Sequence, residues 1–262
     1  MKPIIHFAHA NGVPSKVYQK VFDLLADEYE IIYTPLIGPD KRYPIANGWS
    51  CLTQQVIDSI VQQAQGRAVI GLGHSLGSVL TMQAARKRPE LFNQVILLDP
   101  PLIVGKAAFA MQVLKLLQPK KLDQLSPAGL SKKRRDHWDS REQAAQSLRP
   151  KGFYQNFDQA CFDAYIEHAL MDDPVRGGVT LTIPKMDEVQ IFRTNPLHYW
   201  LPQPHSIVPM HLVVGKDSLF EKKGFPRLIQ KKLGIPYSVA EGGHMFPLEH
   251  PEQTVNLIKK LI

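Results

Sequence analysis

The chain has 262 residues, of which 44% are hydrophobic and 21% are charged, and its formal net charge is +7. The apolar content excludes a disordered chain, and the length suits a single domain with a sizeable core. No run of about 18 apolar residues is present, so we expect no membrane span. Cys51 and Cys161 fit no disulfide or metal-binding pattern, and the N-terminus lacks the pattern of a signal peptide. We therefore expect a cytoplasmic protein with inert thiols.

The positive charge raises the question of a polyanionic partner. The densest basic run covers residues 132–135, and the acidic residues Asp136, Asp139 and Glu142 follow it directly. Interleaved opposite charges are typical of a solvated helix face, and no recognisable nucleic-acid-binding module accompanies the run. Binding of a polyanion is therefore the less favoured interpretation, and we expect neither nucleic acid nor a membrane as partner.

Short β-branched runs alternate with amphipathic patterns near both ends of the chain. The runs predicted to be strands are residues 4–8, 30–34, 68–72, 94–98, 210–214 and 237–240. Apolar residues spaced three or four apart predict helices within residues 17–25, 52–64, 79–85 and 255–261. Alternating strands and helices indicate a parallel sheet covered on both faces. Ligand sites in such sheets lie beyond the carboxyl ends of the strands.

Residues 101–205 interrupt this alternation. They carry helical patterns, including an aromatic-rich one over residues 153–170, and a candidate short strand at 179–183. We interpret them as a mostly helical insertion between the fourth and fifth strands. The predicted organisation is a core over residues 1–100, the insertion over 101–205, and the rest of the core over 206–262.

The most specific motif is Gly73-His74-Ser75-Leu76-Gly77, between a predicted strand and a predicted helix. A serine hydroxyl becomes an effective nucleophile when a tight turn exposes it to a base and to a carbonyl carbon. The two glycines remove side chains that would clash in such a turn. The N-terminus of the following helix directs N–H groups toward a developing oxyanion. Ser75 is therefore the candidate nucleophile.

This motif in its context resembles the α/β-hydrolase superfamily, in the serine-hydrolase branch of esterases and lipases with a helical cap. The resemblance extends over nearly the whole chain. It implies a three-layer α/β sandwich with a mainly parallel sheet of about six strands, without the family's N-terminal hairpin. It also implies a catalytic serine, acid and histidine in that order along the chain.

The expected triad is Ser75, Asp217 and His244. Asp217 follows a predicted strand in a Val-Val-Gly-Lys-Asp sequence, and His244 follows the last strand in Glu-Gly-Gly-His. The histidine would take the proton of the serine, and the aspartate would orient the imidazole ring. Asp99 is the alternative acid because it too ends a predicted strand, and Asp217 is alternatively a helix cap.

The resemblance also implies an oxyanion hole made of two backbone N–H groups. Leu76, directly after the nucleophile, supplies one of them. The sequence His9-Ala10-Asn11-Gly12 resembles the family's His-Gly loop, although Ala10 replaces the glycine. We assign the second donor to the backbone N–H of Asn11.

The insertion resembles the family's helical cap, which excludes water and shapes the substrate pocket. The candidate substrate contacts are Trp200, Tyr199 and Phe157. Packing of the cap onto the core is the alternative role of its aromatic residues, which include Phe153, Tyr154, Phe157, Phe162 and Tyr165. Arg193 or Lys185 could supply a charge for a polar substrate head.

The predicted function is a serine hydrolase that cleaves a small, largely apolar carboxylic ester through an acyl-enzyme, without cofactor or metal. A thioesterase, a carbon–carbon bond hydrolase and an amidase would use the same three residues. A ligand-binding member of the fold with little turnover is an alternative of a different class. The expected partner is a small-molecule substrate, and nothing in the sequence indicates the oligomeric state.

Overall fold

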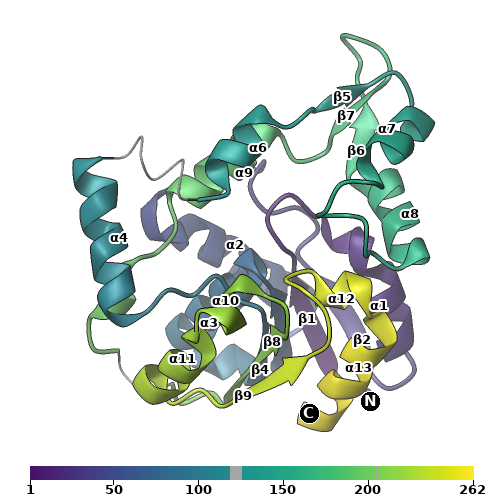
Figure 1. Ribbon diagram of the computed structural model, residues 1–262. Coiled ribbons are helices and arrows are strands. Elements are labelled where there is room, and N and C mark those ends of the chain that lie inside the picture. The colour runs from purple at the N-terminus through teal and green to yellow at the C-terminus, as the bar shows by residue number, and fades with distance from the viewer. Residues whose placement is uncertain (119–125, 204–205) are drawn as a thin grey trace.

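The computed structural model describes residues 1–118, 126–203 and 206–262. A six-stranded sheet forms its centre, with strand order β2-β1-β3-β4-β8-β9 and parallel pairing throughout (Figure 1). The strands are β1 (Ile4–Ala8), β2 (Glu30–Tyr33), β3 (Val69–His74), β4 (Phe92–Leu98), β8 (Met210–Gly215) and β9 (Tyr237–Ala240). All six predicted strands and their parallel arrangement are confirmed.

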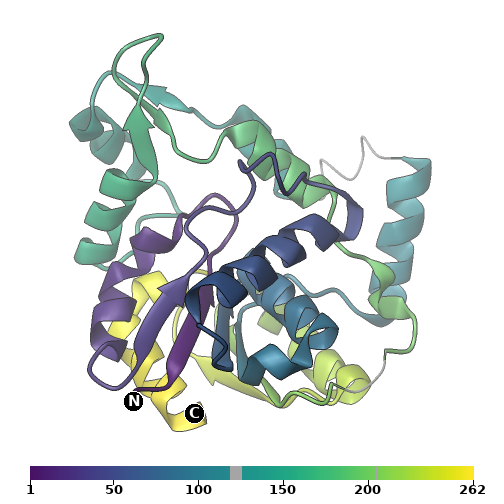
Figure 2. The ribbon, with the colours of Figure 1, turned by 180° about the vertical axis from the view of Figure 1, so that it is seen from behind.

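Helices cover both faces of the sheet, as the continuous apolar strands require. In β1, Ile5 and Phe7 belong to one buried cluster whereas Ile4 and Ala8 belong to the other. The first cluster includes α1 (Gln19–Leu25) and α13 (Pro251–Leu261), and the second includes α2 (Ser50–Gln63), α3 (Leu76–Lys87) and α11 (Phe225–Leu233). Figures 1 and 2 show α1 and α13 on one face of the sheet, and α2 and α3 on the other. The three-layer sandwich is therefore confirmed.

The segment between β4 and β8 combines helices with a small separate sheet. Its helices are α4 (Gly105–Leu117), α6 (Ala128–Lys133), α7 (Arg141–Leu148), α8 (Gln159–His168) and α9 (Lys185–Arg193). Its strands β5 (His137–Trp138), β6 (Leu170–Asp172) and β7 (Val179–Leu181) form an antiparallel sheet of order β5-β7-β6. The candidate strand at 179–183 corresponds to β7, whereas β5 and β6 were not predicted. The remaining short elements are α10 (Leu219–Lys222), α12 (Phe246–Glu249) and 3-10 turns at Ser15–Tyr18, Asn47–Trp49, Pro89–Leu91 and His198–Trp200.

The aromatic stretch at 153–170 is not one helix. The Asp158 side chain accepts hydrogen bonds from the backbone N–H groups of Ala160 and Cys161, so that it caps α8 at its start. Phe153 and Tyr154 therefore lie in the turns before the helix, and Leu170 lies in β6. In the sequence, aromatic residues three or four apart occur on both sides of this cap, which is why the predicted helix was longer than α8.

The inserted segment lies on the side of the sheet to which the carboxyl ends of the strands point (Figure 1). One buried cluster continues from Phe7 and Leu25 into Trp138 and Phe162 of this segment. The backbone N–H of Asp158 donates to the carbonyl oxygen of Leu248 at 2.8 Å, which joins the segment to the core. The helices described are too short or too polar to cross a membrane.

Candidate active site

Ser75 occupies the tight turn between β3 and α3. Its φ of 53° is rare for a residue other than glycine and indicates a strained turn. The turn needs both glycines of the motif. A Cβ atom on Gly77 would lie 2.0 Å from the carbonyl oxygen of Ala8, and one on Gly73 would lie 2.4 Å from that of Gly77. Without these side chains, α3 packs directly against the end of β1.

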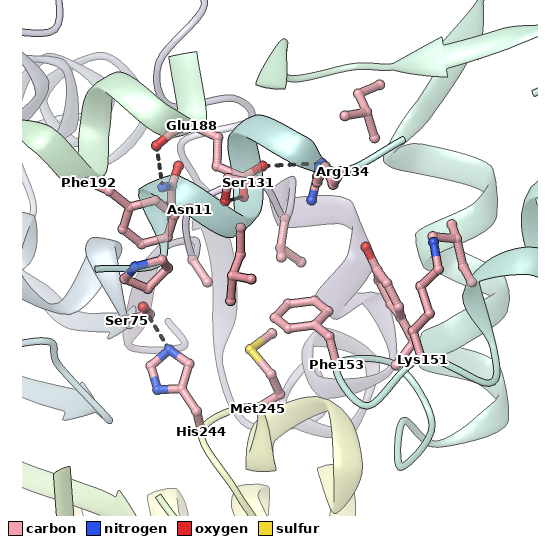
Figure 3. A pocket seen from close by; sticks show the side chains of 18 of the residues that line it. Asn11, Ser75, Ser131, Arg134, Lys151, Phe153, Glu188, Phe192, His244 and Met245 are labelled. Atoms are coloured by element: carbon pink, nitrogen blue, oxygen red, sulfur yellow. Dashed lines mark hydrogen bonds and ion pairs between the residues drawn. The ribbon is translucent and has the colours of Figure 1, made fainter. Parts of the chain in front are cut away.

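His244 lies in the loop after β9, and its ring reaches Ser75. Its Nε2 is 3.0 Å from the Oγ of Ser75 (Figure 3). Its Nδ1 is 2.5 Å from Oδ2 of Asp99, the residue directly after β4. A carboxylate only accepts hydrogen bonds, so Nδ1–H donates to Asp99. In the neutral ring, Nε2 is then left to accept the hydroxyl proton of Ser75.

Asp99 is fully buried and is held by three donors. Besides His244, the backbone N–H of Gly215 donates to its Oδ1 at 3.0 Å, and the hydroxyl of Ser218 donates to its Oδ2 at 2.7 Å. A buried carboxylate needs such partners because its desolvation is unfavourable. The two additional donors fix Asp99 beneath the imidazole ring.

The prediction that Asp217 orients His244 is wrong, because the ring contacts Asp99 instead. The Asp217 side chain is 65% exposed and lies 3.5 Å from Nζ of Lys222. Within the described ranges it makes no hydrogen bond or ion pair with His244. Its backbone N–H donates to the carbonyl oxygen of Gly242, and the next residue, Ser218, turns inward to Asp99 instead.

Two buried histidines, His74 and His9, hold the backbone around the site through hydrogen bonds. The Nε2–H of His74 donates to the carbonyl oxygen of His244 at 2.9 Å, because a carbonyl can only accept. Its Nδ1 therefore accepts from the hydroxyl of Tyr18, at 2.6 Å. In the loop after β1, Nδ1–H of His9 donates to the carbonyl oxygen of Ala10 at 2.7 Å. Burial lowers the pKa of His74 to about 3 and that of His9 to about 4, so both rings are neutral near pH 7.

The two predicted oxyanion donors come from the loop after β1 and from the start of α3. Leu76 is the first residue of α3, where a backbone N–H has no acceptor one turn earlier. The loop that contains Asn11 is held against α3 because the backbone N–H of Gly77 donates to the carbonyl oxygen of His9 at 3.1 Å. In the described ranges, neither Asn11 nor Leu76 donates a backbone hydrogen bond. Both N–H groups are thus free for a ligand.

A cavity of about 410 Å³ opens at Ser75 and His244, and Asn11 also lines it. The remaining lining comes mainly from the inserted segment, including Trp138, Phe153, Tyr154, Leu181 and Phe192.

The predicted substrate contacts do not line this cavity. Tyr199 and Phe157 are buried in the protein, each 2% exposed. Trp200 stacks edge-on against Phe109 and borders a different hollow. Arg193 and Lys185 do not line the cavity either, and Lys185 pairs with Asp136. The cavity is lined instead by Phe153 and Tyr154, which lie in the turns before α8.

A polar group lies in the cavity wall that the inserted segment provides. Nη2 of Arg134 is 3.2 Å from Oε2 of Glu188, and Ser131 donates its hydroxyl hydrogen to Oε1 of Glu188 at 2.6 Å. Burial disfavours the cation, but nearby Tyr165 and Glu188 raise the pKa of Arg134, so its guanidinium stays protonated. Arg134 belongs to the basic run that the sequence suggested was a solvated helix face. In the structure α6 ends at Lys133, and Arg134 turns inward.

The described residues offer no metal-binding cluster, and the thiol of Cys161 is not activated. No group of three or more His, Cys, Asp or Glu side chains in those ranges is placed to hold a metal ion. Burial raises the pKa of the Cys161 thiol to about 12, so it stays protonated.

The sequence missed Ser218, Arg134 and Glu188. Ser218 carried only the signal of a helix cap after Asp217. Neither Arg134 nor Glu188 belongs to a motif. Each lies in a charged stretch of sequence, and such a stretch does not show which of its charges is buried.

Comparison with curated proteins finds distant relatives. A type I acyl-CoA thioesterase of Penicillium brevicompactum is 23% identical over 217 residues, which cover 76% of this chain and 48% of that protein. The chain thus spans about half the length of this thioesterase. The abhydrolase domain-containing protein AFT2-1 of Alternaria alternata is 22% identical over 232 residues, covering 72% of this chain and 81% of that protein.

Solved structures share the fold over nearly the whole chain. An E-2-(acetamidomethylene)succinate hydrolase has a TM-score of 0.75 at 20% identity and covers 99% of this chain and 91% of its own. The thioesterase domain from the curacin biosynthetic pathway has a TM-score of 0.72 at 18% identity and covers 98% and 91%, respectively. A sequence model of the alpha/beta hydrolase family matches residues 7–257. This chain therefore belongs to the alpha/beta hydrolase family.

Proposed function

We propose that the protein is a serine hydrolase with the triad Ser75, His244 and Asp99. The observation that carries the proposal is the continuous contact from the Ser75 hydroxyl through the His244 ring to the buried Asp99 carboxylate. Such a chain lets the imidazole accept the serine proton as the oxygen attacks a carbonyl carbon, while the carboxylate stabilises the imidazolium that forms.

The reaction proceeds in two acyl transfers. Ser75 Oγ forms a bond to the carbonyl carbon, and its proton passes to Nε2 of His244. The tetrahedral intermediate collapses as the leaving group takes that proton, which leaves an acyl-enzyme. A water molecule then attacks the acyl carbon as His244 takes its proton. The bond from the acyl carbon to Ser75 Oγ breaks, His244 returns the proton to Oγ, and the acid leaves. The backbone N–H groups of Leu76 and Asn11 stabilise the oxyanion in both steps.

The substrate we propose is a small carboxylic ester whose apolar part occupies the cavity. Phe153, Leu181 and Met245 are among the side chains that line it. The inserted segment acts as a cap, because its described residues between Pro127 and Phe192 supply most of the cavity lining. A thioester is the second candidate, since relatives named as thioesterases are among the matches.

Steady-state hydrolysis of p-nitrophenyl butyrate and of butyryl-coenzyme A tests this proposal. We expect turnover of at least one of the two by the native protein, and a loss of at least about 10³-fold in kcat for Ser75→Ala and His244→Ala. Circular dichroism checks that both variants remain folded. Turnover that survives in Ser75→Ala, or no turnover by the native protein of either acyl compound, would contradict the proposal.

A further inference from the structure

The cavity has two chemically different ends. Figure 3 shows Ser75 and His244 on one side, and Arg134 and Lys151 on the other. Met245 and Phe153 lie between the two sides in the same view, and Phe153 comes from the inserted segment. A molecule that fills this space therefore meets the nucleophile at one end, apolar side chains along its length, and basic side chains at the other end.

Arg134 has hydrogen-bonding capacity that the protein does not use. Nε and Nη2 of its guanidinium are buried, and neither makes a hydrogen bond to the described residues. Its contact with Glu188 Oε2 is an ion pair by distance, at 3.2 Å, without hydrogen-bond geometry. Glu188 Oε2 likewise accepts no hydrogen bond there. Arg134 also lines the cavity and its side chain is 23% exposed, so a ligand in the cavity can reach this side chain.

The local charge balance at this end is positive. Glu188 is the acidic residue that lines the cavity, and Arg134 compensates it. Arg135 also lines the cavity, but its Nε and Nη2 are occupied by the carbonyl oxygen of His137 and the side chain of Gln143. Lys151 lines the cavity too, and its ammonium group has no ion pair among the described residues. An anionic group in the cavity would thus meet one cation without an ion pair, Lys151, and the partly exposed side chain of Arg134.

We propose that the substrate carries a carboxylate, separated from the scissile carbonyl by an apolar segment, and that Arg134 and Lys151 bind it. This inference rests on the proposed function, because it places the scissile carbonyl at Ser75. Arginine suits a carboxylate because its planar fork matches the two oxygens, and a charge-assisted hydrogen bond is stronger than a neutral one. The apolar middle of the cavity favours a short alkyl or alkenyl spacer over a polar one.

The test compares matched substrates that differ only in the terminal charge. The acyl-side pair is p-nitrophenyl hydrogen adipate and its methyl ester, both followed by release of nitrophenolate. The alcohol-side pair is 6-butyryloxyhexanoate and 6-butyryloxyhexanamide, both followed by release of butyrate. We expect kcat/KM for the carboxylate to exceed that of its neutral counterpart by about 10- to 100-fold in at least one pair, as charge-assisted hydrogen bonds would give.

Variants assign that preference to residues. Arg134→Gln combined with Glu188→Gln removes both members of the buried pair, so no charge is left alone, and should reduce the preference to about the two- to fivefold that Lys151 supplies. Glu188→Gln alone should increase the preference. Lys151→Gln, at an exposed position, should reduce it about two- to fivefold, and Lys87→Gln, whose side chain pairs with Gln54 away from the cavity, should not change it.

The outcomes separate this inference from the proposed function. Hydrolysis of the neutral esters with no preference in either pair, or a preference that the double variant leaves undiminished, overturns the inference and leaves the serine-hydrolase proposal standing. If none of the four substrates is hydrolysed and a fluorophosphonate does not label Ser75, both proposals are overturned.

Discussion

The identity of the acid is the sharpest consequence of the structure, and Asp99→Asn tests it. The substitution keeps the shape of the side chain but removes the charge that faces Nδ1 of His244 at 2.5 Å. The imidazolium that forms during acyl transfer then loses an opposite charge. With charge centres about 4 Å apart and an effective dielectric constant of about 20, that interaction is worth about 4 kcal/mol. An asparagine also permits the wrong tautomer of His244, so we expect kcat to fall about 10³- to 10⁴-fold.

Asp217→Asn is the matched control. Its carboxylate is 65% exposed and pairs with Lys222, so its loss should change kcat less than about twofold. Both variants are assayed for kcat with p-nitrophenyl butyrate, and their thermal unfolding is recorded to exclude loss of fold. A larger decrease in Asp217→Asn than in Asp99→Asn would refute the assignment of the acid and the geometry from which it follows.

Three further predictions concern the turn at Gly77, the hydroxyl of Ser218 and the buried histidines. Gly77→Ala should lower the free energy of unfolding by about 3 kcal/mol or more, because its Cβ would meet a backbone carbonyl. The control is Gly152→Ala, whose Cβ meets nothing within 4 Å and which should change that free energy by less than about 0.5 kcal/mol. Urea unfolding measures both. Ser218→Ala should lower kcat/KM about fivefold by removing a donor to Asp99, and Ser218→Thr, which keeps the hydroxyl, should restore most of it; equal activity of both variants would speak against this role. The third prediction concerns pH, since burial lowers the pKa values of His6, His9 and His74 to between about 3 and about 4. The unfolded chain therefore binds protons below about pH 6.5 that the folded chain does not, so stability should decrease as pH falls from 6.5 toward 5, with each histidine contributing up to about 1.4 kcal/mol per pH unit. Urea unfolding between pH 5 and 8 measures this, and a midpoint that does not change with pH would contradict it.

The elements of the core were predictable because their signals are local. Each strand of the sheet is a short apolar run, and Ser75 lies in a motif whose glycines are required by the close approach of α3 to β1. His244 was predictable from its place in a glycine-containing loop after the last strand. These features depend on residues that are neighbours in the sequence, so the pattern alone identifies them.

The acid could not be chosen from the sequence. Asp99 follows β4 and Asp217 follows β8, and these strands are neighbours in a parallel sheet, so both residues lie at the same edge. The choice depends on how the loop after β8 folds. There the backbone N–H of Asp217 donates to Gly242, which leaves its side chain in solvent and brings Ser218 inward.

The part of the cavity that the inserted segment lines was not predictable from the sequence either. The strands β5, β6 and β7 have only two or three residues each, too few to show a periodic pattern. The aromatic stretch is divided by the turns before α8, so Phe153 lines the cavity while Phe157 is buried and does not. Arg134 follows the last residue of α6, and the sequence does not reveal that it turns toward Glu188.

Intact-protein and peptide mass spectrometry after reaction with a fluorophosphonate asks most directly whether position 75 bears an activated nucleophile. We expect a single adduct on Ser75, none in Ser75→Ala, and labelling slowed at least about 100-fold in His244→Ala. An unmodified Ser75, or labelling at the same rate without His244, would contradict it.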